Sequence, residues 1–391
     1  MRVPKTMISA LFISIAMLCG CGGSGSSSTT PPPPPPAVVA TPTIATAAAQ
    51  NGAVIVTLAT ATTTPTPTLY YTLDGTTPTT SSPIYQAPFL VASNLTVKVL
   101  GTAPGYKNST VATQSFTPNI PSGTLVWSDE FTGKTGTTWG QPNPATWTYD
   151  TGLDCCGNNE QETYCAWGAS TAPCSTSSPN AWVGTDGYLH IQALQPTAGV
   201  ATYTSARLKS QGFFSFMYGR IEARMQLPES QGMWPAFWLL GNNIATINWP
   251  ACGELDVMEH IDGSNPPPYV GGPPPGYDWI AGSVHGGTSG SNELNGSQTF
   301  HPTGFSAAGW HTYGMIWSKG QIQYYVDDPS NIYATFTSTN GAFTSSTWPF
   351  DAGPQFVILN LAVGGDWPGN PNSSTVFPGN MLVDYVRIYT N

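Results

Sequence analysis

Short runs of apolar, β-branched and aromatic residues recur along most of the chain, and several of them alternate apolar with polar positions. Side chains on a β-strand point to opposite faces in turn, so such runs are typical of strands with one face against a core. The clearest runs span residues 54–58, 69–72, 95–100, 188–192, 219–225, 310–317, 321–326, 356–363 and 382–389. No long stretch with helical periodicity follows the N-terminus. The pattern therefore predicts an all-β fold.

Breaks in this pattern divide the chain. Residues 22–37 are rich in Gly, Ser and Thr and end in consecutive prolines, which is typical of a linker. Residues 38–118 contain the first group of strand-like runs and predict a small β-sandwich. Residues 122–391 contain the rest, a length that suits one large β-domain. Segment 1–21 has the character of an export signal.

The N-terminal segment begins with Arg2 and Lys5, followed by an apolar run over residues 7–18. This run is too short to span a bilayer comfortably and has the length of a signal peptide's apolar region. The ending Leu18-Cys19-Gly20-Cys21 resembles the bacterial lipobox, which implies acylation at Cys21. The alternative is an ordinary secretory signal cleaved near Gly20. Both alternatives export the protein, and we expect a lipid anchor in a bacterial membrane.

Charged residues make up only 8% of the chain, aromatic residues 12%, and the formal net charge is −10. A nucleic-acid-binding protein needs clustered Lys and Arg to neutralise phosphates, and the few basic residues here are scattered. The charge thus excludes nucleic acid as a partner. We expect a monomer that acts on an uncharged partner.

Export also permits disulfides. Four cysteines, Cys155, Cys156, Cys165 and Cys174, lie close together in the sequence, so one or two local bridges are expected with their connectivity open. A zinc site is the alternative, but no histidine lies in this stretch. Cys252 is then the candidate for a free thiol.

The strongest chemical signal is Glu254-Leu255-Asp256-Val257-Met258-Glu259, which places three acids in a chain that is poor in charge. On a helix, Glu254 would lie roughly 140° from Glu259 and roughly 160° from Asp256, so the acids would share no face. On a strand, Glu254 and Asp256 share a face, but Glu259 has the opposite parity. One extra residue, a β-bulge near 257–258, restores the parity. Leu255 and one residue of the 257–258 pair should then face the core.

Crowded carboxylates repel one another, which raises at least one pKa and keeps one group protonated near neutral pH. Retaining glycoside hydrolysis requires such a pair, with one carboxylate as the nucleophile and the other as acid and then base. The carboxyl groups of such a pair are roughly 5–5.5 Å apart. A solvated strand face or a calcium site is the alternative interpretation of the acids.

Seven segments carry a family resemblance: Trp127–Phe131, Asn158–Glu160, Tyr203–Arg207, Gly232–Gly241, Trp249-Pro250, Gly253–Glu259 and Leu359–Gly365. They resemble glycoside hydrolase family 16, in its bulged, laminarinase-like branch, and the resemblance covers nearly all of residues 122–390. It implies a jelly roll of two curved sheets with a sugar cleft, in which Glu254 is the nucleophile, Asp256 its helper and Glu259 the acid/base, with no cofactor required for the chemistry.

The same resemblance implies further roles. Trp234, Trp238 and Trp249 match cleft positions where an indole can stack on a pyranose ring, and packing in the core is the alternative for each. Arg207 and Asn159 match positions that bind sugar hydroxyls.

His285 matches a histidine of the family's cleft, and its alternative is a lone surface histidine. Glu130 and Asp384 match positions that help to bind a structural calcium away from the cleft, which oxygen-rich loops permit.

Residues 38–118 contain the motifs Leu73-Asp74-Gly75-Thr76 and Pro83-Ile84-Tyr85. With these motifs the segment resembles the immunoglobulin-like domain that accompanies chitobiases and other bacterial carbohydrate enzymes. The resemblance implies a β-sandwich accessory domain, which could serve as a spacer or bind carbohydrate. Because Tyr70 and Tyr71 alternate on a strand, at least one of them should lie in the core.

The chain departs from the family pattern in an insertion over 155–174 and in a long loop over 266–276, and both could line the cleft. This branch includes enzymes for β-1,3-glucan, mixed-linkage glucan and sulfated galactans. A cleft for sulfated chains would need more Lys and Arg. We therefore expect a retaining endo-β-1,3-glucanase or β-1,3(4)-glucanase. The alternatives are a galactan hydrolase, a transglycosylase and a non-catalytic carbohydrate-binding lipoprotein.

Overall fold

A computed structural model describes residues 35–132, 139–153, 157–195, 202–262, 278–288, 292–339 and 341–391. The predicted signal segment with Cys21, most of the linker, Cys155, Cys156 and the loop over 266–276 lie outside the described residues. Within the described part of the chain, no helix combines the length and the apolar character needed to cross a membrane.

Residues 43–116 form two small antiparallel sheets, with strand orders β1-β2-β4 and β3-β5-β6. Val56, Val97 and Val99 are fully buried between them, and Tyr71 is buried in the same core. The strands predicted in this region are confirmed. Their bounds are β1 (Thr43–Ala48), β2 (Val54–Ala59), β3 (Thr68–Thr72), β4 (Phe89–Val91), β5 (Leu95–Thr102) and β6 (Ala112–Phe116).

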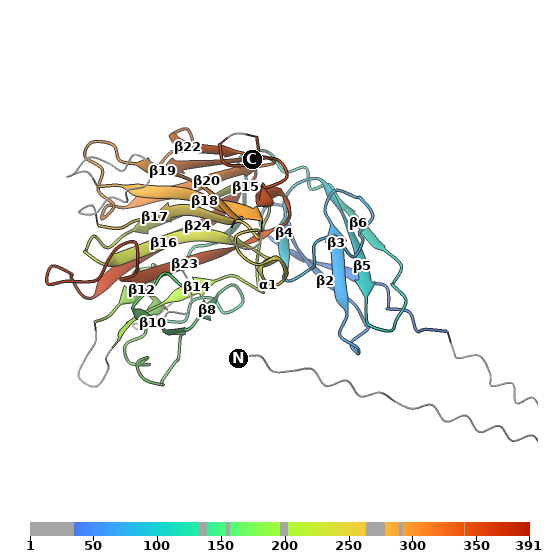
Figure 1. Ribbon diagram of the computed structural model, residues 1–391, viewed down its shortest axis with the longest axis horizontal. Coiled ribbons are helices and arrows are strands. Elements are labelled where there is room, and N and C mark those ends of the chain that lie inside the picture. Colours follow the sequence, from blue (N-terminus) through green and yellow to red (C-terminus); the bar gives the residue numbers. More distant parts are fainter. Residues whose placement is uncertain are drawn as a thin grey trace, which may run out of the picture. The chain divides into compact units, whose positions relative to one another are not determined.

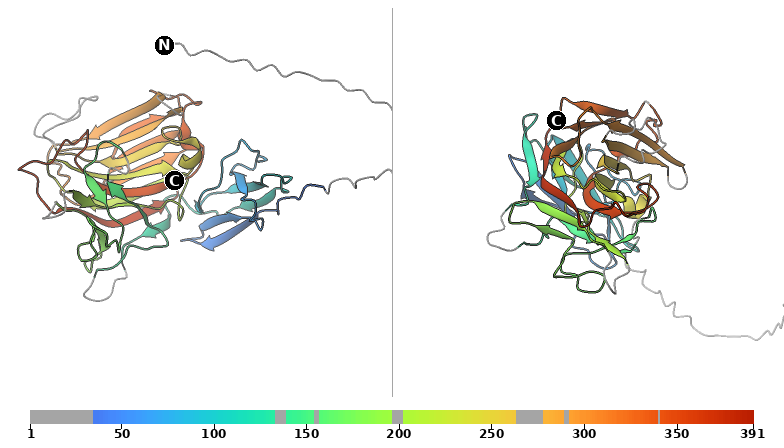
Figure 2. Two further views of the ribbon diagram at one scale, coloured as in Figure 1. Left: turned by 60° about the horizontal axis from the view of Figure 1, so that its bottom comes forward. Right: turned by 90° about the vertical axis from the view of Figure 1, so that its left-hand side faces the viewer.

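The C-terminal part consists of two large sheets (Figures 1 and 2). An eight-stranded sheet has the order β11-β12-β24-β15-β20-β21-β22, with β7 paired to β24. Its strands are β7 (Leu125–Asp129), β11 (Ala181–Val183), β12 (Leu189–Ala193), β15 (Gly219–Gln226), β20 (His311–Ser318), β21 (Gln321–Val326), β22 (Ile332–Thr337) and β24 (Gly379–Tyr389).

A seven-stranded sheet has the order β19-β18-β17-β16-β23-β14-β8, which can be followed down Figure 1. Its strands are β8 (Thr148–Asp150), β14 (Arg207–Lys209), β16 (Met233–Gly241), β17 (Glu254–Glu259), β18 (Ile280–Thr288), β19 (Asn292–Phe300) and β23 (Gln355–Val363). A small third sheet joins β9 (Gly152–Leu153), β10 (Glu162–Tyr164) and β13 (Tyr203–Ser205).

The facing sides of the two large sheets enclose one apolar core. Leu239 and Leu255 from the seven-stranded sheet are fully buried in it, together with Ile221 and Met315 from the eight-stranded sheet. The predicted all-β jelly roll is confirmed, because the helical elements of the described residues are a single turn, α1 (Ile244–Ile247), and a 3₁₀ turn, η1 (Pro349–Asp351). Burying one face leaves the other face of the seven-stranded sheet free to form a site.

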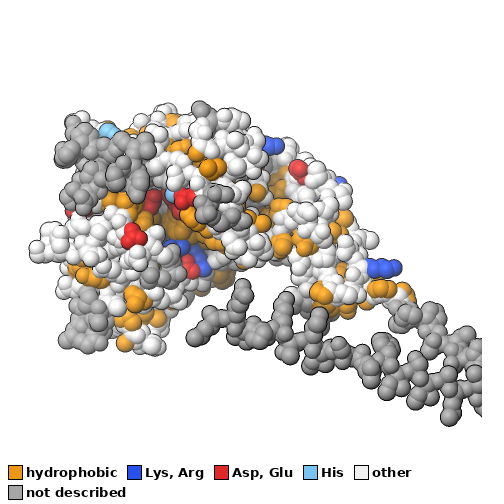
Figure 3. Space-filling view, viewed as in Figure 1, with side chains coloured by type: hydrophobic (Ala, Val, Ile, Leu, Met, Phe, Trp, Pro, Cys, Tyr) orange, Lys and Arg blue, Asp and Glu red, His pale blue; other side chains and the backbone are white. Residues whose placement is uncertain are grey.

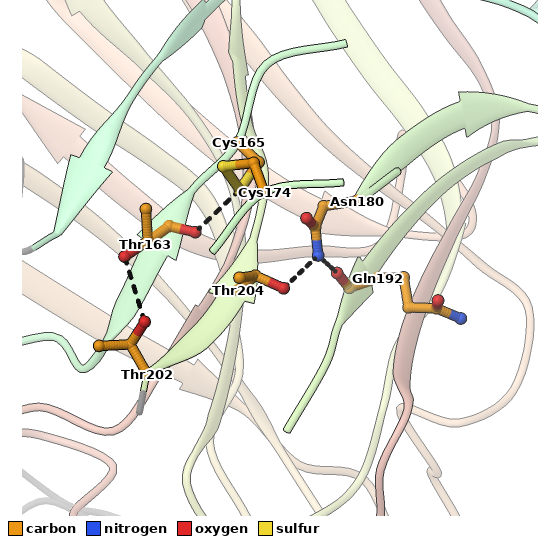
Figure 4. Close-up of a disulfide and its surroundings, with 7 residues drawn as sticks. All are labelled: Thr163, Cys165, Cys174, Asn180, Gln192, Thr202 and Thr204. Carbon is orange, nitrogen blue, oxygen red and sulfur yellow. Dashed lines mark hydrogen bonds between the residues drawn. A yellow bond between two sulfur atoms is a disulfide. The ribbon is translucent and has the colours of Figure 1, made fainter. Parts of the chain in front are cut away.

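One local disulfide joins Cys165 to Cys174, with an S–S distance of 1.95 Å (Figure 4). Beside it, Nδ2 of Asn180 donates hydrogen bonds to Thr204 Oγ1 at 3.0 Å and to the carbonyl of Gln192 at 2.9 Å. Cys252 is a buried free cysteine. Both the local bridge and the free thiol agree with the sequence-based prediction.

Candidate active site

Strand β17 contains the predicted bulge. Asp256 pairs with Trp238 on β16, and Met258 with Phe237, so Val257 is the extra residue. The register to β18 shifts at the same place, between Asp256 and Glu259. Glu254, Asp256 and Glu259 therefore line the same cleft.

One detail of the bulge differs from the prediction. Val257 and Met258 both pack in the core beside Leu255, although only one of the two was expected there. The two residues of a bulge oppose a single residue of the partner strand, and here both side chains point to the apolar side. Packing in the core, on the side of the sheet opposite the cleft, thus holds the bulge in place.

The cleft has a volume of about 1190 Å³ and lies over the solvent-facing side of the seven-stranded sheet. Acidic, basic and apolar side chains gather in this hollow in Figure 3. Polar uncharged residues of β19 and β22 form one wall, among them Asn295, Ser297, Gln298, Thr299, Thr335 and Thr337.

Two tryptophans bind the two glutamates. Nε1 of Trp249 donates to Glu254 Oε2 at 2.9 Å, and Nε1 of Trp234 donates to Glu259 Oε1 at 3.0 Å. Trp249 is 44% exposed, so part of its indole remains open beside Glu254. Trp234 and Trp249 both line the cleft, and each indole fixes one carboxylate, while stacking on a sugar stays a prediction.

The electrostatics of the site favour a shared proton. Burial first, and then the charge of Asp256, raises the pKa of Glu254 to about 8 and that of Glu259 to about 8. His285 and the tryptophan hydrogen bonds act in the opposite direction. Since ionisation of one glutamate makes ionisation of the other harder, the pair titrates as a unit. Near neutral pH, the site holds at least one proton on this pair.

His285 lies in the cleft, as predicted. Its Nε2 is 3.1 Å from Asp256 Oδ2, and its Nδ1 is 2.6 Å from Oε1 of Glu293 on β19. Glu254, Asp256 and His285 are also close enough to suggest a metal site, with their ligand atoms within 4.8 Å of one another. An imidazolium between two carboxylates accounts for this grouping, and a protonated histidine has no lone pair for a metal.

Arg207 and Trp238 both line the cleft, but one face of the Trp238 ring is covered. Trp238 is only 9% exposed, and the guanidinium of Arg207 lies 4.5 Å from its ring centre. Nε1 of Trp238 donates to Asn360 Oδ1 at 2.7 Å. Because Arg207 covers the ring, Trp238 supports Arg207 and does not offer that face to a sugar. Nε of Arg207 donates to Asp150 Oδ2 at 3.0 Å, which fixes its direction.

Asn159 does not line the cleft. Its Nδ2 instead binds both carboxylate oxygens of Asp366, at 2.9 and 3.0 Å. Asn158 and Asn159 have φ angles of 67° and 56°, and this left-handed turn places Asn158, Glu160 and Asp366 in the lining. The predicted role of Asn159 in binding sugar hydroxyls is therefore corrected: Asn159 holds Asp366 in place. A tight turn at consecutive asparagines gives no signal in the sequence for which of the two faces a ligand.

Glu130 and Asp384 are both used in ion pairs. Arg387 donates to the two carboxylate oxygens of Glu130 at 2.9 and 2.8 Å. Arg224 donates to Asp384 at 2.7 Å. The two carboxylates thus bind different arginines, and the calcium site at these residues stays a prediction.

The two tryptophan hydrogen bonds yield a paired prediction on pH dependence. Each bond lowers the pKa of its glutamate, so its loss raises that pKa. We expect Trp249→Phe to move the acidic limb of kcat/KM to higher pH, because Glu254 then ionises later. Trp234→Phe should instead move the basic limb to higher pH, because Glu259 then keeps its proton longer. The profiles of free enzyme report both limbs. If Trp249→Phe moved the basic limb and Trp234→Phe the acidic limb, the two glutamates would have the opposite roles.

Comparison with known proteins agrees with this geometry. Residues 168–387 match the model of the glycosyl hydrolases family 16, and residues 56–116 match the Fn3 associated family. The chain is 36% identical to a β-glucanase of Rhodothermus marinus over 277 residues, which covers 69% of this chain and 86% of that protein.

The chain is also similar to a second glucanase and to a laminarinase of known structure. The glucan endo-1,3-β-glucosidase A1 of Niallia circulans is 34% identical over 286 residues, which covers 70% of this chain but only 38% of that longer protein. The laminarinase catalytic domain of Thermotoga maritima MSB8 superposes with a TM-score of 0.54 at 31% identity, covering 69% of this chain and 99% of that domain.

Proposed function

The chain belongs to glycosyl hydrolase family 16, and from this premise we propose that it is a retaining endo-β-1,3-glucanase, with β-1,3(4)-glucan as a related substrate. The observation that carries the proposal is the bulged strand, which sets Glu254 and Glu259 in one cleft with Asp256 between them. A carbohydrate-binding protein has no need of three acids whose mutual repulsion costs stability.

In the first step, the carboxylate of Glu254 attacks the anomeric carbon while Glu259 gives its proton to the leaving glycosidic oxygen. The C–O bond of the glycoside breaks, and a glycosyl ester with Glu254 forms. In the second step, Glu259 takes a proton from a water molecule, which attacks the same carbon and frees Glu254. Each step is a displacement with inversion, so two steps retain the configuration.

The charges around the two glutamates support this division of roles. The positive charge of Arg207 lowers the pKa of Glu254 and so favours the ionised form that a nucleophile needs. The repulsion between the two glutamates is mutual, so it keeps one of them protonated, and the proposed mechanism assigns that proton to Glu259 as the acid.

The cleft suits a neutral polymer. Its lysine and arginine residues, Arg207 and Lys209, both bind Asp150, and the carboxylates of the lining outnumber them, which disfavours an anionic polymer. The polar wall from β19 and β22 supplies uncharged donors and acceptors for hydroxyl groups. The glucanase names of the similar proteins support the same substrate class.

The proposal is tested on purified protein with laminarin, lichenan, agarose and carrageenan, by following reducing ends and product lengths. We expect new ends and internal cleavage with laminarin, weaker or equal cleavage of lichenan, and none with the galactans. Cleavage of a galactan alone would replace the glucan proposal, and an absence of new ends on every polymer would reject the hydrolase itself.

We further propose that the protein is exported and anchored by a lipid on Cys21. The lipobox-like ending at Cys21 and the disulfide between Cys165 and Cys174 support this, because disulfides persist in oxidising compartments. Cys21→Ala should move the protein from the membrane fraction to the soluble fraction of a bacterial host. Cys19→Ala is the matched control and should leave the partition unchanged. Equal partition of the two variants would reject the anchor.

A further inference from the structure

Glu293 occupies a position that the family motifs do not mark, yet it contacts the centre of the site through one histidine. Oε1 of Glu293 accepts a hydrogen bond from His285 Nδ1 at 2.6 Å, and the opposite nitrogen of His285 lies 3.1 Å from Asp256. Nδ2 of Asn295 donates to the same Glu293 oxygen at 3.0 Å, which holds that carboxylate in place. Asp256 lies on β17, His285 on the adjacent β18, and Glu293 and Asn295 on the next strand, β19.

This geometry favours the charged form of histidine, because a carboxylate lies beside each ring nitrogen, Glu293 as a hydrogen-bond acceptor and Asp256 in ion-pair contact. A neutral imidazole has one N–H and one lone pair, so it would direct its lone pair at one of the two carboxylates. Burial alone lowers the pKa of His285, but the carboxylates of Asp256 and Glu293 outweigh burial and raise this pKa well above its usual value.

The groups that face His285 come from both neighbouring strands. Glu254 and Asp256 lie on β17, Glu293 lies on β19, and the ring of Trp249 has its centre 6.3 Å away. Glu293 is 31% exposed at its side chain, whereas Asp256 is 4% exposed. Glu293 can therefore be changed at the rim of the cleft without opening the buried strand β17.

We propose that Glu293 is a positioning residue, which holds His285 as an imidazolium against Asp256 and so gives the crowded acids a fixed positive neighbour. The inference rests on the proposed function and adds to it. The charge of His285 lowers the pKa of both Glu254 and Glu259. Without Glu293, His285 loses its hydrogen bond at Nδ1 and one of its two carboxylate neighbours, so its positive charge is held less strongly and the acids keep their protons more strongly.

The decisive experiment is an NMR titration of the histidine rings in the full chain. Glu293→Gln keeps the size and an acceptor oxygen but removes the charge, and His285→Asn assigns the His285 signals. We expect His285 to titrate well above its usual range in the wild type, and its pKa to fall in Glu293→Gln, which removes one of the two negative charges beside the ring. Asp328→Asn removes a charge from an exposed turn outside the cleft lining and should leave the titration unchanged.

The pH profile gives the second readout. In Glu293→Gln the acidic limb of kcat/KM should move to higher pH, and Glu293→Asp, which keeps the charge, should restore most of the wild-type profile. A wild-type His285 that titrates near its usual value of about 6.5, or a titration that Glu293→Gln does not change, would overturn the proposal. Because the titration needs no substrate, it decides this point even if no polysaccharide is cleaved.

Discussion

Replacing Glu254 by serine is expected to lower kcat on laminarin by about 10⁴-fold or more, since the reaction loses its nucleophile and the covalent intermediate cannot form. Serine is too short to reach the anomeric carbon from the same strand position. The measurement is the initial rate of reducing-end release at saturating substrate. Retention of more than a trace of activity would show that another group attacks the sugar.

The thermal stability of Glu254→Ser shows whether its activity is lost because the nucleophile is absent or because the protein unfolds. The pKa of Glu254 is raised in the folded protein, so the native state binds more protons than the unfolded state between about pH 4.5 and about pH 8. Stability contributed by this group therefore falls as the pH rises through that window. Glu254→Ser removes the free-energy cost of ionising this buried carboxyl group. We therefore expect the midpoint of thermal unfolding of Glu254→Ser at pH 7 to equal or exceed that of the wild type. A lower midpoint would attribute the lost activity to a damaged fold.

Replacing Glu259 by glutamine is expected to lower kcat on polysaccharide by about 10²- to 10⁴-fold, the range of general acid–base catalysis. Glutamine keeps the size and can still accept the hydrogen bond from Trp234 Nε1, but it has no proton to transfer. With an aryl β-glycoside of a laminari-oligosaccharide, the first step should slow down less than with polysaccharide, because the aryl leaving group departs without needing a proton. The measurement is the ratio of the two losses in kcat/KM, which reports the first step.

Azide distinguishes the two glutamates in one assay. In Glu259→Gln, azide needs no base and can open the intermediate on Glu254, which gives a β-glycosyl azide. In Glu254→Ser, azide can occupy the emptied space and attack the substrate directly, which gives the α-glycosyl azide. Production of the same anomer by both variants would contradict the separate roles.

The bulge on β17 could be predicted from the sequence because parity is a local property. Two acids five positions apart cannot share a face of a regular strand, and the apolar residues between them need the opposite face. The long strands β15, β20, β21 and β24 were predictable for the same reason, since alternation records which side meets the core. The existence of the cleft followed from the family resemblance, and not from the pattern.

Contacts between distant segments could not be predicted in this way. Asn159 lies within a motif, yet its partner Asp366 is remote in sequence, and a left-handed turn decides which asparagine faces the cleft. Trp238 carries the signature of a sugar-stacking residue, but Arg207 from β14 covers its ring. Glu293 gives no signal at all, because its importance depends on the register between β18 and β19.

The central claim is that Glu254 and Glu259 act by double displacement, and the stereochemistry of the first product tests it most directly. Wild-type protein is added to laminarin or a laminari-oligosaccharide in deuterated buffer, and the anomeric protons of the product are followed by ¹H NMR from the first minutes. The account predicts that the β-anomer appears first and that the α-anomer grows only later, by mutarotation. Initial appearance of the α-anomer would mean a single displacement by water and would contradict the account.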